Sequence, residues 1–310
     1  MTSRPEALHA SRTARLLLET VGISIGLGWA SLAIDPSQWT LRVGIALAQG
    51  CWLHRVYFVG HEAVHRKLLP GRPLRNDVLG QLALLPLLLP LGVYRKIHRF
   101  HHACNRLDER TSALDTFVIA ADAGALTRFR CRVLWYVAVF AGGFFVHSLV
   151  SVVLFLVLPL STARRVSPAF AGWRERDRWT AIAALAAAVA LHLGVAATAG
   201  ADVWARLFGW PMLAFAWVYS LLVYIYHYDT GYGRPTGANV RSLAAPAIVS
   251  WWLLGFNEHA THHADPSLPW YLLRREARDD PSARRSILRG ILDQLRGPRI
   301  VPAPPRSETA

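Results

Sequence analysis

Long apolar runs alternate with short polar segments along this chain. The runs at 16–34, about 42–59, 133–160, 181–200 and 207–226 each approach or exceed the ~20 residues that a helix needs to cross a bilayer. They are rich in leucine and alanine, and no alternating ten-residue strand pattern interrupts them, so helix is the spanning element. The pattern predicts an all-α, polytopic membrane protein.

Two apolar stretches do not fit a simple crossing. The stretch 78–93 is too short to cross twice and contains Pro86 and Pro90, so we expect a re-entrant or interfacial pair of helices there. The run 133–160 leaves two possibilities open, because it suits one long crossing or a shallow hairpin that turns at residues 141–143.

Composition and charge support a membrane protein and give it an orientation. Of the 310 residues 53% are hydrophobic and 17% charged, and the net charge is +14. Basic residues gather between the apolar runs, as at 164–166 and 174–178, and such loops stay on the cytoplasmic side. Only Lys67 and Lys96 of the 34 basic residues are lysines, which is typical of a GC-rich bacterial genome. We therefore expect a bacterial inner (cytoplasmic) membrane protein and, since no reading motif occurs, no nucleic-acid partner.

The chain divides into one domain with polar ends. Residues 1–15 form an N-terminal cytoplasmic segment, 16–273 the membrane domain, and 274–310 a basic cytoplasmic tail. In the tail, apolar positions between 287 and 295 recur at helical spacing with arginines on the other faces, so we expect this segment to lie on anionic lipid.

Histidines are concentrated in three windows of five residues. Eight of the thirteen histidines fall in HEAVH, HRFHH and HATHH, namely His61, His65, His98, His101, His102, His259, His262 and His263. Positions i, i+3 and i+4 share one face of a helix, so each window aims its imidazoles in one direction. Counting crossings places all three windows on the cytoplasmic side. Eight rings exceed what one tetrahedral zinc uses and suit two metals of higher coordination number.

The histidine windows and their flanks resemble those of the membrane fatty acid desaturase superfamily. GHEAVH, HRFHHACNRLDERTSALDTF and FNEHATHHADPSLPWYLL are similar to its three histidine boxes in order and context, and the resemblance runs from about residue 42 to 273. That superfamily of di-iron enzymes also includes carotenoid ketolases and hydroxylases. The resemblance implies a cytoplasmic di-metal cap on a helical membrane domain, with His227 as a ninth ligand beside the eight box histidines.

The resemblance also implies the chemistry. It implies an oxidoreductase that uses two iron ions (Fe²⁺/Fe³⁺) and O₂ to oxidise unactivated C–H bonds in a lipid, with fatty acyl desaturation as the expected outcome. A carotenoid or other lipid hydroxylase or ketolase is the alternative, because both outcomes share one ligand set. The less favoured alternative is a membrane zinc metalloprotease using HEAVH as H-E-x-x-H, which leaves six box histidines unused.

Polar residues beside the boxes are candidates for orienting the metal-bound imidazoles, which usually donate their second N–H to a carboxylate or carbonyl. The alternative for each carboxylate is a solvated loop position. The candidates are Glu62, Asp108, Asp115, Asp229, Asn257, Glu258 and Asp265. The apolar segment 244–256 either lines a slot for an acyl chain or anchors the chain at the interface.

Electrons for such an oxidation must come from outside the chain. The sequence contains no CxxC iron–sulfur run, no HPGG haem segment and no GxGxxG nucleotide fingerprint. We therefore expect a ferredoxin or a similar electron carrier, with its reductase, as partner, and a membrane lipid or acyl chain as substrate.

Overall fold

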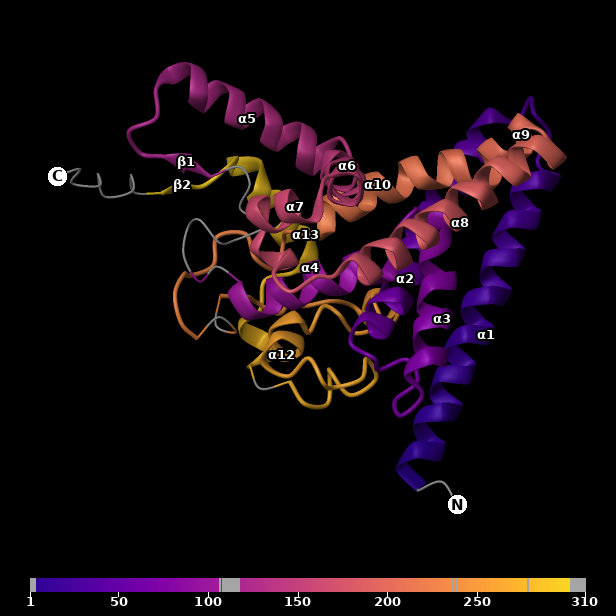
Figure 1. The fold of residues 1–310 in the computed structure, drawn as a ribbon, viewed down its shortest axis with the longest axis horizontal. Coiled ribbons are helices and arrows are strands. Elements are labelled where there is room, and N and C mark those ends of the chain that lie inside the picture. Colours follow the sequence, from indigo (N-terminus) through magenta and orange to yellow (C-terminus); the bar gives the residue numbers. More distant parts are fainter. Residues whose placement is uncertain are drawn as a thin grey trace.

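A computed structural model describes residues 4–105, 107, 118–235, 237, 239–277 and 279–301 (Figure 1). Helices dominate it, joined by short 3-10 turns, one π-helical turn and one pair of two-residue strands. The α-helices are α1 (Arg4–Ala33), α2 (Trp39–Val64), α3 (Pro73–Leu84), α4 (Leu91–Cys104), α5 (Ala125–Phe140), α6 (Gly143–Val157), α7 (Leu160–Val166), α8 (Glu175–Ala199), α9 (Ala201–Trp204), α10 (Trp210–Leu222), α11 (Ala247–Trp252), α12 (His259–Ala264) and α13 (Ile287–Asp293). The other elements are η1 (Leu85–Leu87), η2 (Pro168–Phe170), η3 (Ala205–Gly209), η5 (Pro281–Ala283), η6 (Gln294–Arg296), β1 (Ile119–Ala120) and β2 (Ile300–Val301).

The membrane-spanning character predicted from the sequence is confirmed. Among the described residues, Leu8–Ala33, Glu175–Ala199 and Ala201–Leu222 are long and apolar enough to cross a membrane. The number rises from three to five if each of two bent helix pairs forms one span. The run at 42–59 forms α2, which is not among these candidates and is instead buried over most of its second half, against α1, α3 and α10.

The first bent pair lies where the sequence predicts a re-entrant or interfacial pair. The segment Pro73–Leu87 meets α4 at an angle of 97°. Leu88 has a positive φ of 56° between them, and α4 begins directly after Pro90. Proline cannot continue a helix from its interior but suits a helix start, so the sequence both breaks α3 and starts α4.

The second bent pair turns at residues 141–143, in the run for which the sequence left one long crossing and a shallow hairpin open. α5 and α6 meet at 96°, a bend that fits a broken span or a re-entrant loop and excludes one straight helix across the membrane. Gly142 has a φ of +82°, which favours glycine, and a Cβ on Gly143 would come within 2.8 Å of the Ala138 Cα. The two glycines therefore allow the turn at the position that the sequence indicated.

The C-terminal segment packs back onto the membrane domain. β2 pairs in parallel with β1 through Ile119 and Ile300. Ile287 and Ile291 of α13 pack against the main core, and the Trp135 indole on α5 donates to the carbonyl of Gln294 at 2.9 Å. Residues 279–301 are therefore part of the packed structure.

Candidate metal centre

Eight histidine side chains form two groups of four. In each group, one ring nitrogen from every member lies within 4.8 Å of the others. The first group is His61, His65, His98 and His262, and the second is His101, His227, His259 and His263. Each group draws on more than one histidine window, so the tertiary fold creates them.

Three helices and one loop supply these side chains. His61 lies in the last turn of α2, whose C-cap is His65, and α4 carries the middle window. α12 carries the third window beside α4 (Figure 1), while His227 follows the end of α10. α2 and α4 are long enough to be held by packing along their length, so the histidines on these two helices stand on rigid elements.

His102 belongs to neither group of four but lies between them. Its Nε2 is 3.0 Å from Nε2 of His98 in the first group, and its ring centroid is 4.2 Å from that of His263 in the second. All nine histidines predicted as ligands are thus gathered at one place.

Ring nitrogens face ring nitrogens across these groups. The Nε2 atoms of His61 and His98 are 2.7 Å apart. The same atoms are 3.1 Å apart in the pair of His101 with His263 and in the pair of His227 with His259. Several nitrogen lone pairs therefore converge on the same small volumes.

Burial favours the neutral form of the imidazoles on α12. His61, His227 and His262 are 3% exposed or less. On α12, desolvation by burial is the largest cause that lowers the pKa of His259, His262 and His263 well below the ordinary value, and the neighbouring histidines lower it further. A neutral imidazole is the form that binds a metal.

The donor set fits a pair of metal ions. Within the part of the chain that the structure describes, neither ring nitrogen of His262 has a hydrogen-bond partner, and the same holds for His61 Nδ1, His65 Nε2 and His259 Nδ1. A buried polar atom left without a partner costs about 1–3 kcal/mol. Because an imidazole binds a metal through one nitrogen, coordination would offset this cost at one of the two nitrogens of His262. Nine nitrogen donors around two points suit iron, zinc or copper.

A cavity of about 670 Å³ adjoins both groups. Its wall includes His61 and His98 of the first group and His101, His227 and His259 of the second. The rest is mainly apolar and aromatic, from α2, α4, α6 and the segment after α10. This volume and lining are typical of a binding site for an apolar ligand.

Sequence reasoning missed the aromatic residues that line the cavity beside the histidines. The Phe256 ring packs edge-on against His61 with centroids 4.4 Å apart, and Tyr94 lies 5.5 Å from His98. Tyr57 and Tyr94 each precede a box histidine by four residues, which places tyrosine and histidine on one helix face. This spacing could have indicated from the sequence that both tyrosines lie beside the histidine groups.

The polar residues expected to orient imidazoles have other contacts. Buried Glu62 accepts the Trp270 backbone N–H at 3.2 Å, and Glu258 pairs with Arg284. Half-exposed Asp229 lies 3.7 Å from Arg296.

Two more of these candidates also have identified partners. The Asn257 Oδ1 accepts a hydrogen bond from Ser250 Oγ at 2.7 Å, and Asp265 accepts the Ser267 N–H at 2.9 Å. Asp108 and Asp115 lie outside the described residues. Of the segment 244–256, Phe256 lines the cavity.

Comparison with known proteins identifies the family. The family model described as fatty acid desaturase matches residues 37–286. Three curated relatives are each named sn-1 oleoyl-lipid 12-desaturase: 35% identical over 88 residues in Anabaena variabilis, 33% over 97 in Picosynechococcus sp., and 31% over 87 in Arthrospira platensis. These segments cover 28%, 31% and 28% of this chain and only 24%, 26% and 24% of the relatives. Because the family model spans most of the chain and both histidine groups, the chain belongs to the fatty acid desaturase family.

Proposed function

We propose that this protein uses O₂ to oxidise unactivated C–H bonds of a membrane lipid, and that it thereby introduces a double bond into an acyl chain. The single observation that carries the proposal is the juxtaposition of two four-histidine groups with one large apolar cavity in a fatty acid desaturase family member. The names of the relatives, which act on an acyl group of a lipid, support the same substrate class.

We assign the metals as two iron ions. His61, His65, His98 and His262 would hold one ion, and a second set would hold the other. That second set is His101, His227, His259 and His263, with His102 between the two groups. Iron supplies the redox chemistry with O₂ that side chains lack. The chain's own part is to keep the imidazoles neutral and to exclude water by burial.

The acyl chain would lie in the 670 Å³ cavity. Leu89, Ile97, Phe145 and Val152 give it an apolar wall, while the histidines of both groups close one side. An apolar slot of this kind holds a methylene chain by burial of its surface, and rigid walls fix which carbon atoms approach the metals.

Electrons would come from a ferredoxin or similar carrier with its reductase. Lys67, Arg95 and Arg99 lie close enough to His65 to act on it electrostatically, and Arg66 and Arg99 are exposed. A basic surface beside the centre attracts an acidic partner. The basic segments also support a bacterial inner-membrane location with the histidine boxes on the cytoplasmic side.

Lipid analysis under labelled oxygen tests the proposal. The protein is expressed in a bacterial host with ¹⁸O₂, beside the His262→Ala variant. We expect new double bonds in the acyl chains of the parent culture, no ¹⁸O in the lipid, and neither change with the variant. Incorporation of ¹⁸O into lipid would instead identify the hydroxylase or ketolase alternative, and unchanged lipids would count against both.

A further inference from the structure

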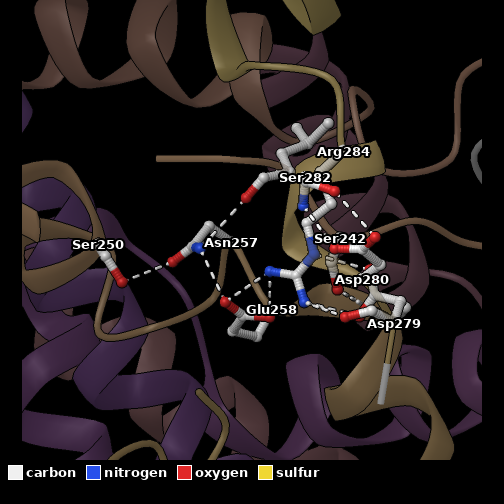
Figure 2. Close-up of polar contacts among 10 residues, drawn as sticks. Ser242, Ser250, Asn257, Glu258, Asp279, Asp280, Ser282 and Arg284 are labelled. Carbon is white, nitrogen blue, oxygen red and sulfur yellow. Dashed lines mark hydrogen bonds and ion pairs between the residues drawn. The ribbon is translucent and has the colours of Figure 1, made fainter. Parts of the chain in front are cut away.

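Arg284 is a buried cation between two carboxylates (Figure 2). Its side chain is 6% exposed, and its Nη1 lies 2.8 Å from Glu258 Oε1 and 2.7 Å from Oε2. Its Nε and Nη2 each lie 2.7 Å from an oxygen of Asp279, in a two-pronged contact. The guanidinium therefore ties the segment before α13 to the residue that precedes His259.

Glu258 depends on this contact. Its side chain is 4% exposed, and an ionised carboxylate removed from water needs a charged partner. Asn257 Nδ2 donates a further hydrogen bond to Glu258 Oε1 at 3.3 Å, but a neutral amide does not balance the charge. Loss of Arg284 would leave the Glu258 carboxylate buried without its charged partner, which favours movement of this residue out of its present position.

The position of Glu258 sets the start of α12. The Glu258 carbonyl accepts the His262 N–H at 3.1 Å, which is the first hydrogen bond of the helix. The Glu258 side chain does not cap the helix, and Ser242 Oγ accepts the Ala260 N–H at 3.2 Å instead. α12 has only six residues, and a helix this short is not stable by itself. Contacts from outside must hold it.

Backbone contacts join the same segments. The Ala244 N–H donates to the Arg285 carbonyl at 2.8 Å, and the Ile287 N–H donates to the Ala244 carbonyl at 3.3 Å. Asn257 Nδ2 donates to the Leu243 carbonyl at 3.2 Å. The Arg284 side chain and this ladder together fix the third histidine window against the C-terminal segment.

We infer that Arg284 is a positioning residue of the metal centre, acting through Glu258 on the third histidine window. The inference rests on the proposed function, because it assumes that the histidine groups hold metals. α12 supplies two members of the second group, His259 and His263, and one of the first, His262. Displacing α12 therefore weakens the second group more than the first.

The test measures metal binding without turnover. Metal-free, detergent-solubilised full-length protein is titrated with Co²⁺ alone, and visible absorption follows each equivalent bound. We expect the parent to bind two equivalents. We expect Arg284→Met to bind one equivalent nearly as the parent does and the second about tenfold or more weakly, the range measured when a residue that orients a ligand is removed. The matched control is Arg285→Met, since Arg285 is 45% exposed and pairs with Asp293.

A second substitution that restores Co²⁺ binding would distinguish a positioning role of Arg284 from a general loss of stability. The double variant Arg284→Met with Glu258→Gln removes both buried charges, so we expect it to recover most of the second Co²⁺ affinity. Arg284→Lys keeps the charge but lacks the fork that reaches two carboxylates, so we expect an intermediate loss. If Arg284→Met does not fold, the lysine variant decides the question.

Each outcome has a definite meaning. Parent-like Co²⁺ binding in the Arg284 variants would overturn the role of Arg284 and leave the metal centre standing. Equal weakening of both equivalents without rescue would also overturn it, because that is the result of a general structural defect. A parent that binds no Co²⁺ would overturn the metal centre itself and the inference with it.

Discussion

The Tyr94 hydroxyl donates a hydrogen bond to the Tyr57 hydroxyl, and the two rings stack with centroids 5.3 Å apart. The pair joins α4 to α2 in the wall of the cavity, one turn before His98 and His61. It therefore fixes the spacing of the two helices that carry five of the nine histidines.

Tyr94→Phe removes the hydroxyl and keeps the ring. We expect a loss of about 1 kcal/mol in stability, the usual net worth of one hydrogen bond, with metal content unchanged because no histidine is removed. Heating detergent-solubilised protein and following the folded fraction by size-exclusion chromatography measures the loss. An unaltered midpoint would show that the Tyr57 contact does not hold the helices together.

His101→Ala and His262→Ala each remove one member of a different group. We expect either variant to insert into the membrane, to retain about one metal per chain where the parent retains two, and to lose activity, because three nitrogens hold an ion less tightly than four. Elemental analysis of the purified proteins gives the count. His192→Ala is the control, since His192 is also buried but lies outside both groups, and it should keep both metals. A single zinc that survives loss of His101 would favour the peptidase reading of HEAVH.

Val152→Trp places a large side chain into the cavity from α6. Because the cavity is the proposed seat of the acyl chain, we expect activity to fall about tenfold or more while metal content stays at the parent value. Val153→Trp is the matched control, because the neighbouring valine is 46% exposed and does not line the cavity. Fatty acid profiles of cells that express each variant compare them. Equal fatty acid profiles for the two variants would indicate that the acyl chain does not bind in this cavity.

Glu62→Gln separates a structural glutamate from a catalytic base. The buried Glu62 side chain accepts the Trp270 N–H, and a glutamine oxygen can accept the same bond. We therefore expect metal content and lipid products close to those of the parent. Complete loss of activity with both metals retained would instead assign Glu62 a direct part in the chemistry, as a peptidase base would have.

The histidine windows predicted which residues gather, but not how they divide. Neighbours on a helix point about 100° apart, so His262 and His263 enter different groups although they are adjacent in sequence. His98 and His101 also enter different groups, although they are three residues apart and share one face of α4. The division depends on how α2, α4 and α12 are oriented relative to one another, and tertiary packing sets that orientation. The spacing of histidines within one window therefore cannot predict the division.

Two other features lay beyond sequence reasoning for different reasons. Arg284 is far from the third window in sequence, and its contact with Glu258 exists only because the C-terminal segment folds back. The turn at residues 141–143 was indicated by its glycines, whereas the right angle between α5 and α6 was not. Glycine allows the backbone to turn but does not determine the angle between the two helices.

The place of Arg284 in the chain has a consequence for how the centre comes into being. Translation proceeds from the amino end, so all nine histidines leave the ribosome before Arg284 does. Until that arginine arrives, Glu258 lacks the ion pair that helps to fix the third histidine window. The ion pair that positions α12 therefore forms only after every histidine of the two groups has been synthesised. If the inference above holds, tight binding of the second metal has to wait for this later part of the chain.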